Sequence, residues 1–148
     1  MARNEMLEFA PDPGGRRVFK LLLIASLAAG ALASLAKPMA VPGLPFWLIA
    51  PVWTLIYILM AVAAWLAWKK GGWRTWAMTL YAGQLVLGLF WRTWPGPIIA
   101  LALDFCMLLT LVALLRRNRW AALAFLPCLT WTVFLTVSNI AHWRLPWM

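Results

Sequence analysis

Aromatic and weakly polar side chains recur at helical spacing on three apolar stretches of this chain, and together they could bind a flat ligand. Residues three, four or seven positions apart share one face of a helix. The sets are Trp53 and Tyr57 on one stretch, Tyr81, Gln84 and Trp91 on another, and Trp131 and Ser138 with the neighbouring Asn139 on a third. Indole rings with a few hydrogen-bonding groups suit a planar, largely apolar molecule. For any one of these tryptophans, packing between helices is an equally good explanation.

One carboxylate, Asp104, falls near the middle of an apolar stretch. Its ionised form is costly in hydrocarbon, which makes such a residue a functional candidate by default. The residue could pair with a base, stay protonated and form a hydrogen bond, or meet a ligand. No partner for it is visible in the sequence, so structural pairing and function both stay open.

The other reactive side chains form no catalytic or metal-binding pattern. Cys106 and Cys128 have neither metal-ligand spacing nor a Cys-x-x-Cys pattern, so we expect them to be small packing residues. His142 has no His or Cys neighbour that could complete a metal site. No phosphate-binding glycine loop, nucleophile elbow or paired carboxylate occurs. We therefore predict no catalytic residue, no metal and no covalently bound cofactor.

Five apolar stretches must position these residues, and they run over 18–36, 47–68, 75–94, 97–115 and 120–142. Each is close to the roughly 20 residues that a helix needs to cross a bilayer. Hydrophobic residues make up 65% of the chain and charged residues 11%, whereas soluble domains have roughly 45 to 50% and 25%. The ten-residue alternation of a lipid-facing strand is absent. The sequence predicts an all-α integral membrane protein, with one five-transmembrane-helix bundle over residues 18–148.

Basic residues divide unequally between the two ends of such a bundle. Ten Lys and Arg lie at the N-terminus or in the second and fourth gaps, while only Lys37, Arg92 and Arg144 lie on the other side. The positive-inside rule then places the N-terminus in the cytoplasm and the C-terminus outside. The net charge of +9 indicates this topology and an affinity for anionic headgroups of the lipid bilayer. Because no soluble domain presents a basic cluster, nucleic acid is not an expected partner.

The segment before the first apolar stretch, residues 1–17, contains Pro11, Pro13, Gly14 and Gly15. Such a composition favours a flexible cytoplasmic tail. A cleaved signal peptide is the alternative for the first stretch. It fits less well, because this leader is longer and more acidic than the usual basic region.

Three motifs in this chain also occur together in a known family. Lys37-Pro38 with the run from Pro45 to Met60 is the first, Tyr81 to Leu85 with Trp91 the second, and Phe125-Leu126-Pro127, Trp131, Phe134, Asn139 and Trp143-Arg144 the third. They resemble, in order, the first loop and second helix, the third helix and the fifth helix of the tryptophan-rich sensory protein family, also called the translocator protein or peripheral benzodiazepine receptor family. The resemblance covers residues 21–146. The chain resembles a divergent bacterial-type member, expected in the bacterial inner membrane.

Some positions depart from the family pattern. Gly88 stands where the family usually has Asn, and Cys128 follows Pro127 where the family has Tyr. The gap after the third-helix Trp is shorter than in the family. Ile140 and Ala141 occupy the place of the aromatic residue that a proposed sterol-binding motif requires.

The resemblance implies a five-helix bundle that forms a homodimer and binds a tetrapyrrole, such as a porphyrin or heme, in a cavity beneath the first loop. Family positions that face this space correspond to Trp47, Trp53, Tyr57, Gln84, Trp91, Trp131 and Asn139. The expected roles are ring stacking for the tryptophans, and polar anchoring for Tyr57, Gln84 and Asn139.

Three functions from different classes stay open. The first is a membrane receptor or carrier that binds a tetrapyrrole or a similar planar aromatic ligand, with a sensory or transport role. The second is an enzyme that degrades a bound porphyrin in light. The third is a membrane scaffold or assembly factor with a decayed pocket, which Gly88, Cys128 and the shortened third gap would explain.

Overall fold

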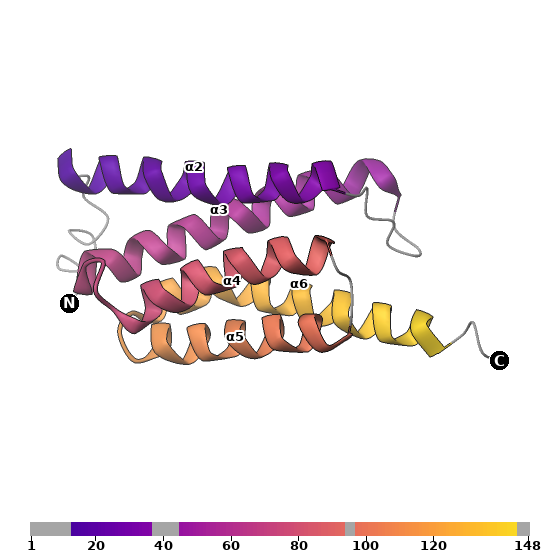
Figure 1. Cartoon of the computed structure of the whole chain (residues 1–148). Coiled ribbons are helices and arrows are strands. Elements are labelled where there is room, and N and C mark those ends of the chain that lie inside the picture. Colours follow the sequence, from indigo (N-terminus) through magenta and orange to yellow (C-terminus); the bar gives the residue numbers. More distant parts are fainter. Residues whose placement is uncertain (1–12, 37–44, 94–96, 145–148) are drawn as a thin grey trace.

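A computed structural model describes residues 13–36, 45–93 and 97–144. These residues form five helices with no strand among the described residues (Figure 1). The helices are α2 (Pro13–Ala36), α3 (Phe46–Gly71), α4 (Trp76–Thr93), α5 (Pro97–Leu115) and α6 (Arg119–Arg144). Each coincides with one of the predicted apolar stretches. The all-helical prediction is therefore confirmed.

The helix boundaries differ most from the predicted ones at the start of α2, which begins at Pro13 rather than at Val18. Proline is favoured in the first turn of a helix, because its missing N–H would have no partner there and its φ angle is already helical. The expected tail thus contributes residues 13–17 to the first helix. Residues 1–12 lie outside the described part.

Hydropathy supports a membrane bundle to different degrees in different helices. By length and composition alone, the described helices long and apolar enough to cross a membrane are Trp47–Gly71, Pro97–Leu115 and Arg119–Ser138, and Trp76–Trp91 is a shorter apolar helix. Helix α2 does not meet the same criterion within its described residues. It carries Arg16, Arg17 and Lys20 in its first third, which lowers its mean hydropathy.

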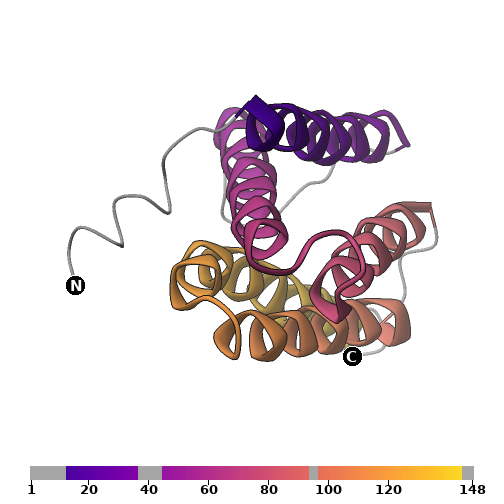
Figure 2. The same cartoon turned by 90° about the vertical axis from the view of Figure 1, so that its left-hand side faces the viewer.

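The helices form a closed ring in which the neighbours are not always consecutive. Helix α2 packs on α3, α3 on α6, α6 on α5, α5 on α4, and α4 returns to α2. Figure 2 shows the helices from one end of the bundle. Helix α6 therefore lies between α3 and α5, and the faces that carry the predicted site residues turn toward a shared interior.

Small residues allow the helices to approach closely. On α3 the buried positions include Ala61, Ala63, Ala64 and Ala67. Interfaces between membrane helices are enriched in small side chains, because these let the backbones come near. Cys128 on α6 is also fully buried, and its Sγ lies 3.5 Å from the carbonyl oxygen of Ile56. Its surroundings fit the packing role that we expected for it.

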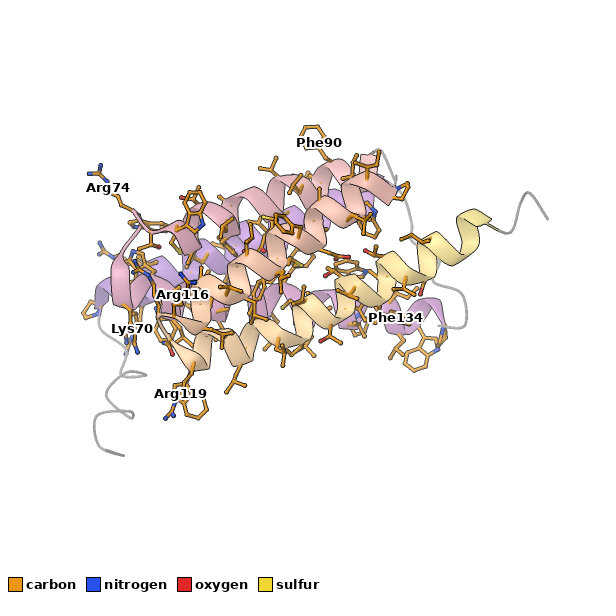
Figure 3. All side chains as sticks on the ribbon, turned by 90° about the horizontal axis from the view of Figure 1, so that it is seen from below. Lys70, Arg74, Phe90, Arg116, Arg119 and Phe134 are labelled. Atoms are coloured by element: carbon orange, nitrogen blue, oxygen red, sulfur yellow. The ribbon has the colours of Figure 1, made fainter. Side chains whose placement is uncertain are left out.

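One end of the bundle gathers the positive charge. Every Lys and Arg whose side chain the structure describes belongs to it, namely Arg16, Arg17, Lys20, Lys69, Lys70, Arg74, Arg116, Arg117 and Arg119. Figure 3 shows Lys70, Arg74, Arg116 and Arg119 together at this end, away from Phe134. We call it the basic end. The gathering of these residues at one end matches the predicted unequal division of basic residues. That this end faces the cytoplasm stays a prediction.

Candidate ligand site

Aromatic rings from α3 and α6 form a continuous chain in the half of the bundle away from the basic end. Trp53 stacks on Tyr57, with ring centroids 5.8 Å apart and planes inclined by 27°. Trp53 also meets Trp131 edge-on, at 6.2 Å and 89°. Trp131 continues to Phe134 at 5.6 Å. The stacked and edge-to-face geometries are those that aromatic pairs prefer.

Helices α4 and α5 complete this region. Trp91 is buried together with Ile49, Ala100 and Leu135, and Trp53, Ile99 and Trp131 pack against this cluster. Four helices thus meet around three of the predicted site residues, Trp53, Trp91 and Trp131. We call this group, with Tyr57, the aromatic cluster.

The Tyr57 ring is held between two helices. A Cβ atom added to Gly30 of α2 would lie 2.5 Å from Cε2 of this ring, which is closer than van der Waals contact. The ring therefore lies directly against the α2 backbone, with Trp53 stacked beside it. Only glycine at position 30 permits this approach. The position of α2 is thereby coupled to the aromatic cluster.

Gln84 is the most deeply buried polar residue predicted for the site, with 2% of its surface exposed. Thr110 Oγ1 lies 3.4 Å from Gln84 Oε1, while Nε2 of the same amide has no hydrogen-bond partner among the described residues. The indole Nε1 of Trp131 is likewise buried without a partner there. Such groups cost about 1 to 3 kcal/mol each when nothing satisfies them, so each calls for an explanation.

Open space lies beside Gln84. A Cβ atom added to Gly88 would meet no atom within 4 Å. Gly88 lies on the face of α4 that carries the buried residues Tyr81, Gln84 and Trp91, because these positions are separated by three, four or seven residues. The departure from the family pattern at position 88 therefore coincides with unfilled room on the inner face of α4.

Of two further predicted site residues, one lies outside the cluster and the other has no described side chain. The side chain of Trp47 is 73% exposed on the first turn of α3, which suits an anchor at the membrane surface. The side chain of Asn139 lies outside the described part. A role for either residue in ligand binding stays a prediction.

Asp104 occupies a different side of α5. Cys106 and Thr110 contact α4, whereas Met107 contacts Thr132 of α6. At about 100° per residue, Asp104 lies roughly 60° beyond Met107, on the side away from α4. Its Oδ1 is buried without a partner in the described part. Asp104 follows Ala100, which is buried with Trp91, by one helical turn, and its role stays open.

Ser26, which the sequence did not single out, holds α2 in place together with Tyr81. The Ser26 hydroxyl is hydrogen-bonded to the Tyr81 hydroxyl, which lies 3.3 Å from the carbonyl oxygen of Leu22. Both Ser26 and Tyr81 are buried. Small residues surround Gly30 in the sequence, but they do not indicate which ring packs against that glycine.

The described side chains show no group of three or more His, Cys, Asp or Glu residues that could hold a metal ion. The chemistry of the aromatic cluster is accordingly that of stacking, apolar contact and isolated hydrogen bonds.

Comparison with known proteins assigns this arrangement to a family. The sequence pattern of the TspO/MBR family matches residues 18–144, which include α3 to α6 and α2 from Val18 onward. The chain belongs to the TspO/MBR family. As a member, it is a multi-pass integral membrane protein.

Similar proteins come from archaea, bacteria and mammals. The tryptophan-rich protein TspO of Archaeoglobus fulgidus is 31% identical over 122 residues, covering 76% of this chain and 78% of that protein. The translocator protein of Sus scrofa is 32% identical over 76% of this chain and 72% of its own. The tryptophan-rich sensory protein of Cereibacter sphaeroides is 28% identical over 70% of each chain. An inner-membrane location is consistent with the bacterial relatives.

Proposed function

We propose that this family member is a membrane receptor or carrier for a tetrapyrrole or a similar planar aromatic ligand. The observation that carries the proposal is the contact of Trp53 with Trp131, 6.2 Å apart on two helices, beside the buried Trp91. Large flat rings from different helices provide stacking surfaces for a flat ligand. The unpaired Gln84 and Trp131 groups supply polar contacts of the kind that orient a ligand in an apolar site.

The placement of the cluster suggests the route of the ligand. It lies in the half of the bundle away from the basic end. With the N-terminus in the cytoplasm, as the positive charge indicates, that half faces outward. A ligand would then arrive from the outer side or from the outer leaflet. A receptor would signal its arrival through α2, which contacts Tyr57 at Gly30.

Titration of the purified protein in the dark with protoporphyrin and with heme tests the proposal. Saturable quenching of tryptophan fluorescence is expected, and Trp53→Phe and Trp131→Phe should each weaken it. Trp76→Phe is the matched control, because Trp76 is 69% exposed at the basic end. Absence of saturable binding, or equal affinity in all variants, would contradict the proposal and favour the scaffold function.

Light-dependent porphyrin degradation is a second candidate, favoured by the two indoles in mutual contact at the cluster. Indole rings are oxidisable, and they would lie against an illuminated porphyrin. Product formation should then require light, oxygen and Trp53 or Trp131. Bleaching at the rate of free porphyrin would eliminate this activity.

We also propose a homodimer formed through α2. Its outward face is apolar and partly small, with Leu21, Ile24, Ala28 and Leu32 exposed. Small residues on a membrane helix favour close packing with a second helix. Cross-linking of single-cysteine variants at positions 24 and 28 in lipid nanodiscs should yield a dimer, and failure at both positions would exclude this face.

A further inference from the structure

Two loops at the basic end contact each other although both carry positive charge. One connects α3 to α4 and the other connects α5 to α6. Each loop, taken with the adjoining helix ends, carries three basic residues, namely Lys69, Lys70 and Arg74 on the first and Arg116, Arg117 and Arg119 on the second. Figure 3 shows residues of both sets at the same end of the bundle.

The guanidinium of Arg117 makes the contact between the loops. A Cβ atom added to Gly71, the last residue of α3, would collide with Nη1 of Arg117 and would lie 2.6 Å from Cγ2 of Thr75. Arg117 therefore reaches from the end of α5 to the connection between α3 and α4. Its side chain is nevertheless exposed. Because a guanidinium has five N–H donors in a planar fork, an anion outside the bundle can still be hydrogen-bonded to it.

The described residues provide no carboxylate that could balance these charges. The one acidic residue among them, Asp104, lies near the middle of α5, about 18 Å before Arg116 along the helix axis. The C-terminal end of a helix, as at α3 and α5, supplies only about half a negative charge. The positive-inside rule explains why basic residues occur on one side of a membrane, but it does not explain a contact between two basic loops. An anion that binds both loops would offset their repulsion.

The helices that follow the two loops favour an anion at the same place. Helix α4 begins at Trp76 and helix α6 at Arg119, and neither has an acidic residue in its first turn. A helix N-terminus carries partial positive charge, which acidic side chains often offset. Here Arg74 and Arg119 add positive charge instead. Phosphate groups are the anions that commonly bind beside helix N-termini.

Exposed apolar side chains stand next to these cations in the sequence. Leu115, which precedes Arg116, is 58% exposed, and Trp76, two residues after Arg74, is 69% exposed. In a membrane protein such side chains contact acyl chains, and tryptophans lie at the level of the headgroups. A molecule that joins a phosphate to acyl chains would contact both kinds of side chain, whereas a soluble phosphate would contact the cations alone.

We propose that the two loops together bind the phosphate group of one anionic phospholipid, with Arg117 as its principal hydrogen-bond donor. The lipid lowers the repulsion between the loops and thereby holds the end of α3 against the end of α5. This site is separate from the aromatic cluster and does not depend on what that cluster binds.

Native mass spectrometry of the detergent-solubilised protein tests the proposal, with dioleoylphosphatidylglycerol and dioleoylphosphatidylcholine as probes. The parent should bind one phosphatidylglycerol at least about fivefold more tightly than phosphatidylcholine. Arg117→Gln should weaken phosphatidylglycerol binding about tenfold, as the loss of a hydrogen bond to a charged group predicts. Arg17→Gln, on α2, removes the same charge and should weaken binding less than about twofold, because distant charges are screened by the buffer salt.

Two variants that keep the net charge examine the geometry of the site. Gly71→Ala would displace the Arg117 guanidinium and should weaken phosphatidylglycerol binding. Arg117→Lys should do the same, because an ammonium lacks the paired donors of the fork. Gly83→Ala is the matched glycine control, since its added Cβ would meet only Cys106 Sγ at 4.0 Å. Unchanged thermal unfolding establishes that each variant is folded.

Equal losses in Arg117→Gln and Arg17→Gln would overturn the inference, because they would indicate general attraction by net charge. Equal binding of the two lipids would overturn it as well. Displacement of phosphatidylglycerol by millimolar glycerol 3-phosphate would assign the loops to a soluble phosphate instead of a lipid.

The acidic residues of the N-terminal segment, Glu5, Glu8 and Asp12, are the remaining source of negative charge in the chain. They lie outside the described residues. The triple variant Glu5→Gln, Glu8→Gln, Asp12→Asn should bind phosphatidylglycerol like the parent. A tenfold gain in affinity would mean that these carboxylates occupy the loops in the parent, and it would overturn the proposal.

Discussion

Buried polar groups are mostly hydrogen-bonded at the basic end. In the half of the bundle that contains the aromatic cluster, which we call the aromatic half, some of them have no partner. At the basic end the Asn118 side chain accepts the backbone N–H of Trp120 at 2.9 Å and caps α6. Thr75 accepts the N–H of Met78 at 3.4 Å and caps α4. The Trp65 indole donates to the carbonyl oxygen of Gly15 at 3.0 Å. Among the described residues of this end, Trp68 is the exception, because its buried indole Nε1 has no hydrogen-bond partner.

The loops of the basic end also contact each other. The guanidinium of Arg117, which follows α5, lies against Gly71 at the end of α3. Gly72 then reverses the chain with a φ of 66°, a conformation that glycine adopts without strain. This end is therefore held together by its own residues, through helix caps and a contact between loops.

The aromatic half instead keeps Gln84 and Trp131 unsatisfied and leaves space at Gly88. These features lower stability, and binding sites commonly carry such a cost. The difference indicates that the basic end is held together by its own hydrogen bonds, whereas the other half keeps polar groups that the proposed ligand would satisfy. Variants matched between the halves can test this division.

The largest effect is expected from removing both indoles of the cluster. Trp53→Ala with Trp131→Ala should raise the Kd for porphyrin more than about 30-fold, because central aromatic anchors each contribute about 2 kcal/mol or more. The matched double variant Trp73→Ala, Trp76→Ala at the basic end should bind like the parent. Fluorescence of the porphyrin itself reports binding in both. Equal losses of porphyrin affinity in the two double variants would contradict the distinction between the halves.

A smaller effect is expected from adding one methyl group at either of two glycines. Gly30→Ala would force Tyr57 away from α2, and such overpacking costs about 1 to 3 kcal/mol. Gly83→Ala has ordinary space and should gain slightly from the better helix propensity of alanine. Thermal unfolding in detergent and the porphyrin Kd measure both variants. A Gly30→Ala protein as stable and as tight-binding as Gly83→Ala would show that Tyr57 is not held by α2.

Loss of a cap should affect stability alone. Asn118→Ala removes the side-chain acceptor at the start of α6 and should destabilise the protein by about 1 kcal/mol. Its ligand affinity should equal that of the parent, because the change lies at the basic end. A lower unfolding temperature with an unchanged Kd is the expected result. An altered Kd would mean that the two halves are coupled.

A small change in stability is expected at Gln84. Gln84→Leu replaces a buried amide that lacks a partner and should leave stability unchanged or raise it by up to about 1 kcal/mol. Thermal unfolding without ligand measures this effect. A clear loss of stability would mean that the amide has a structural partner.

The sequence predicted the helices well, because five long apolar runs leave the backbone no other way to satisfy its hydrogen bonds in a membrane. It also predicted the faces of Trp53, Gln84 and Trp131 from their spacing. It could not predict which helices are neighbours, since periodicity indicates a buried face and not what covers it. For the same reason the contact between Gly30 and Tyr57 was not foreseen.

Trp47 and Asp104 show the limit most clearly. Trp47 was predicted because it corresponds to a family position. Asp104 was a candidate because it is an acid within an apolar stretch. Trp47 is exposed at the start of α3, and Asp104 lies on the side of α5 away from α4. Whether such residues reach the cluster depends on helix ends and on rotation about the helix axis, which the residue pattern alone does not fix.

The order of the helices in the ring also bears on biosynthesis. Helix α6 is made after the other four, yet it lies between α3 and α5 and supplies Trp131. Until it inserts into the bilayer, α3 and α5 lack their common neighbour and the unpaired groups of the cluster have no enclosure. The contact of Trp53 with Trp131 can therefore form only when the last helix has inserted, so the aromatic cluster is among the last parts of the fold to assemble.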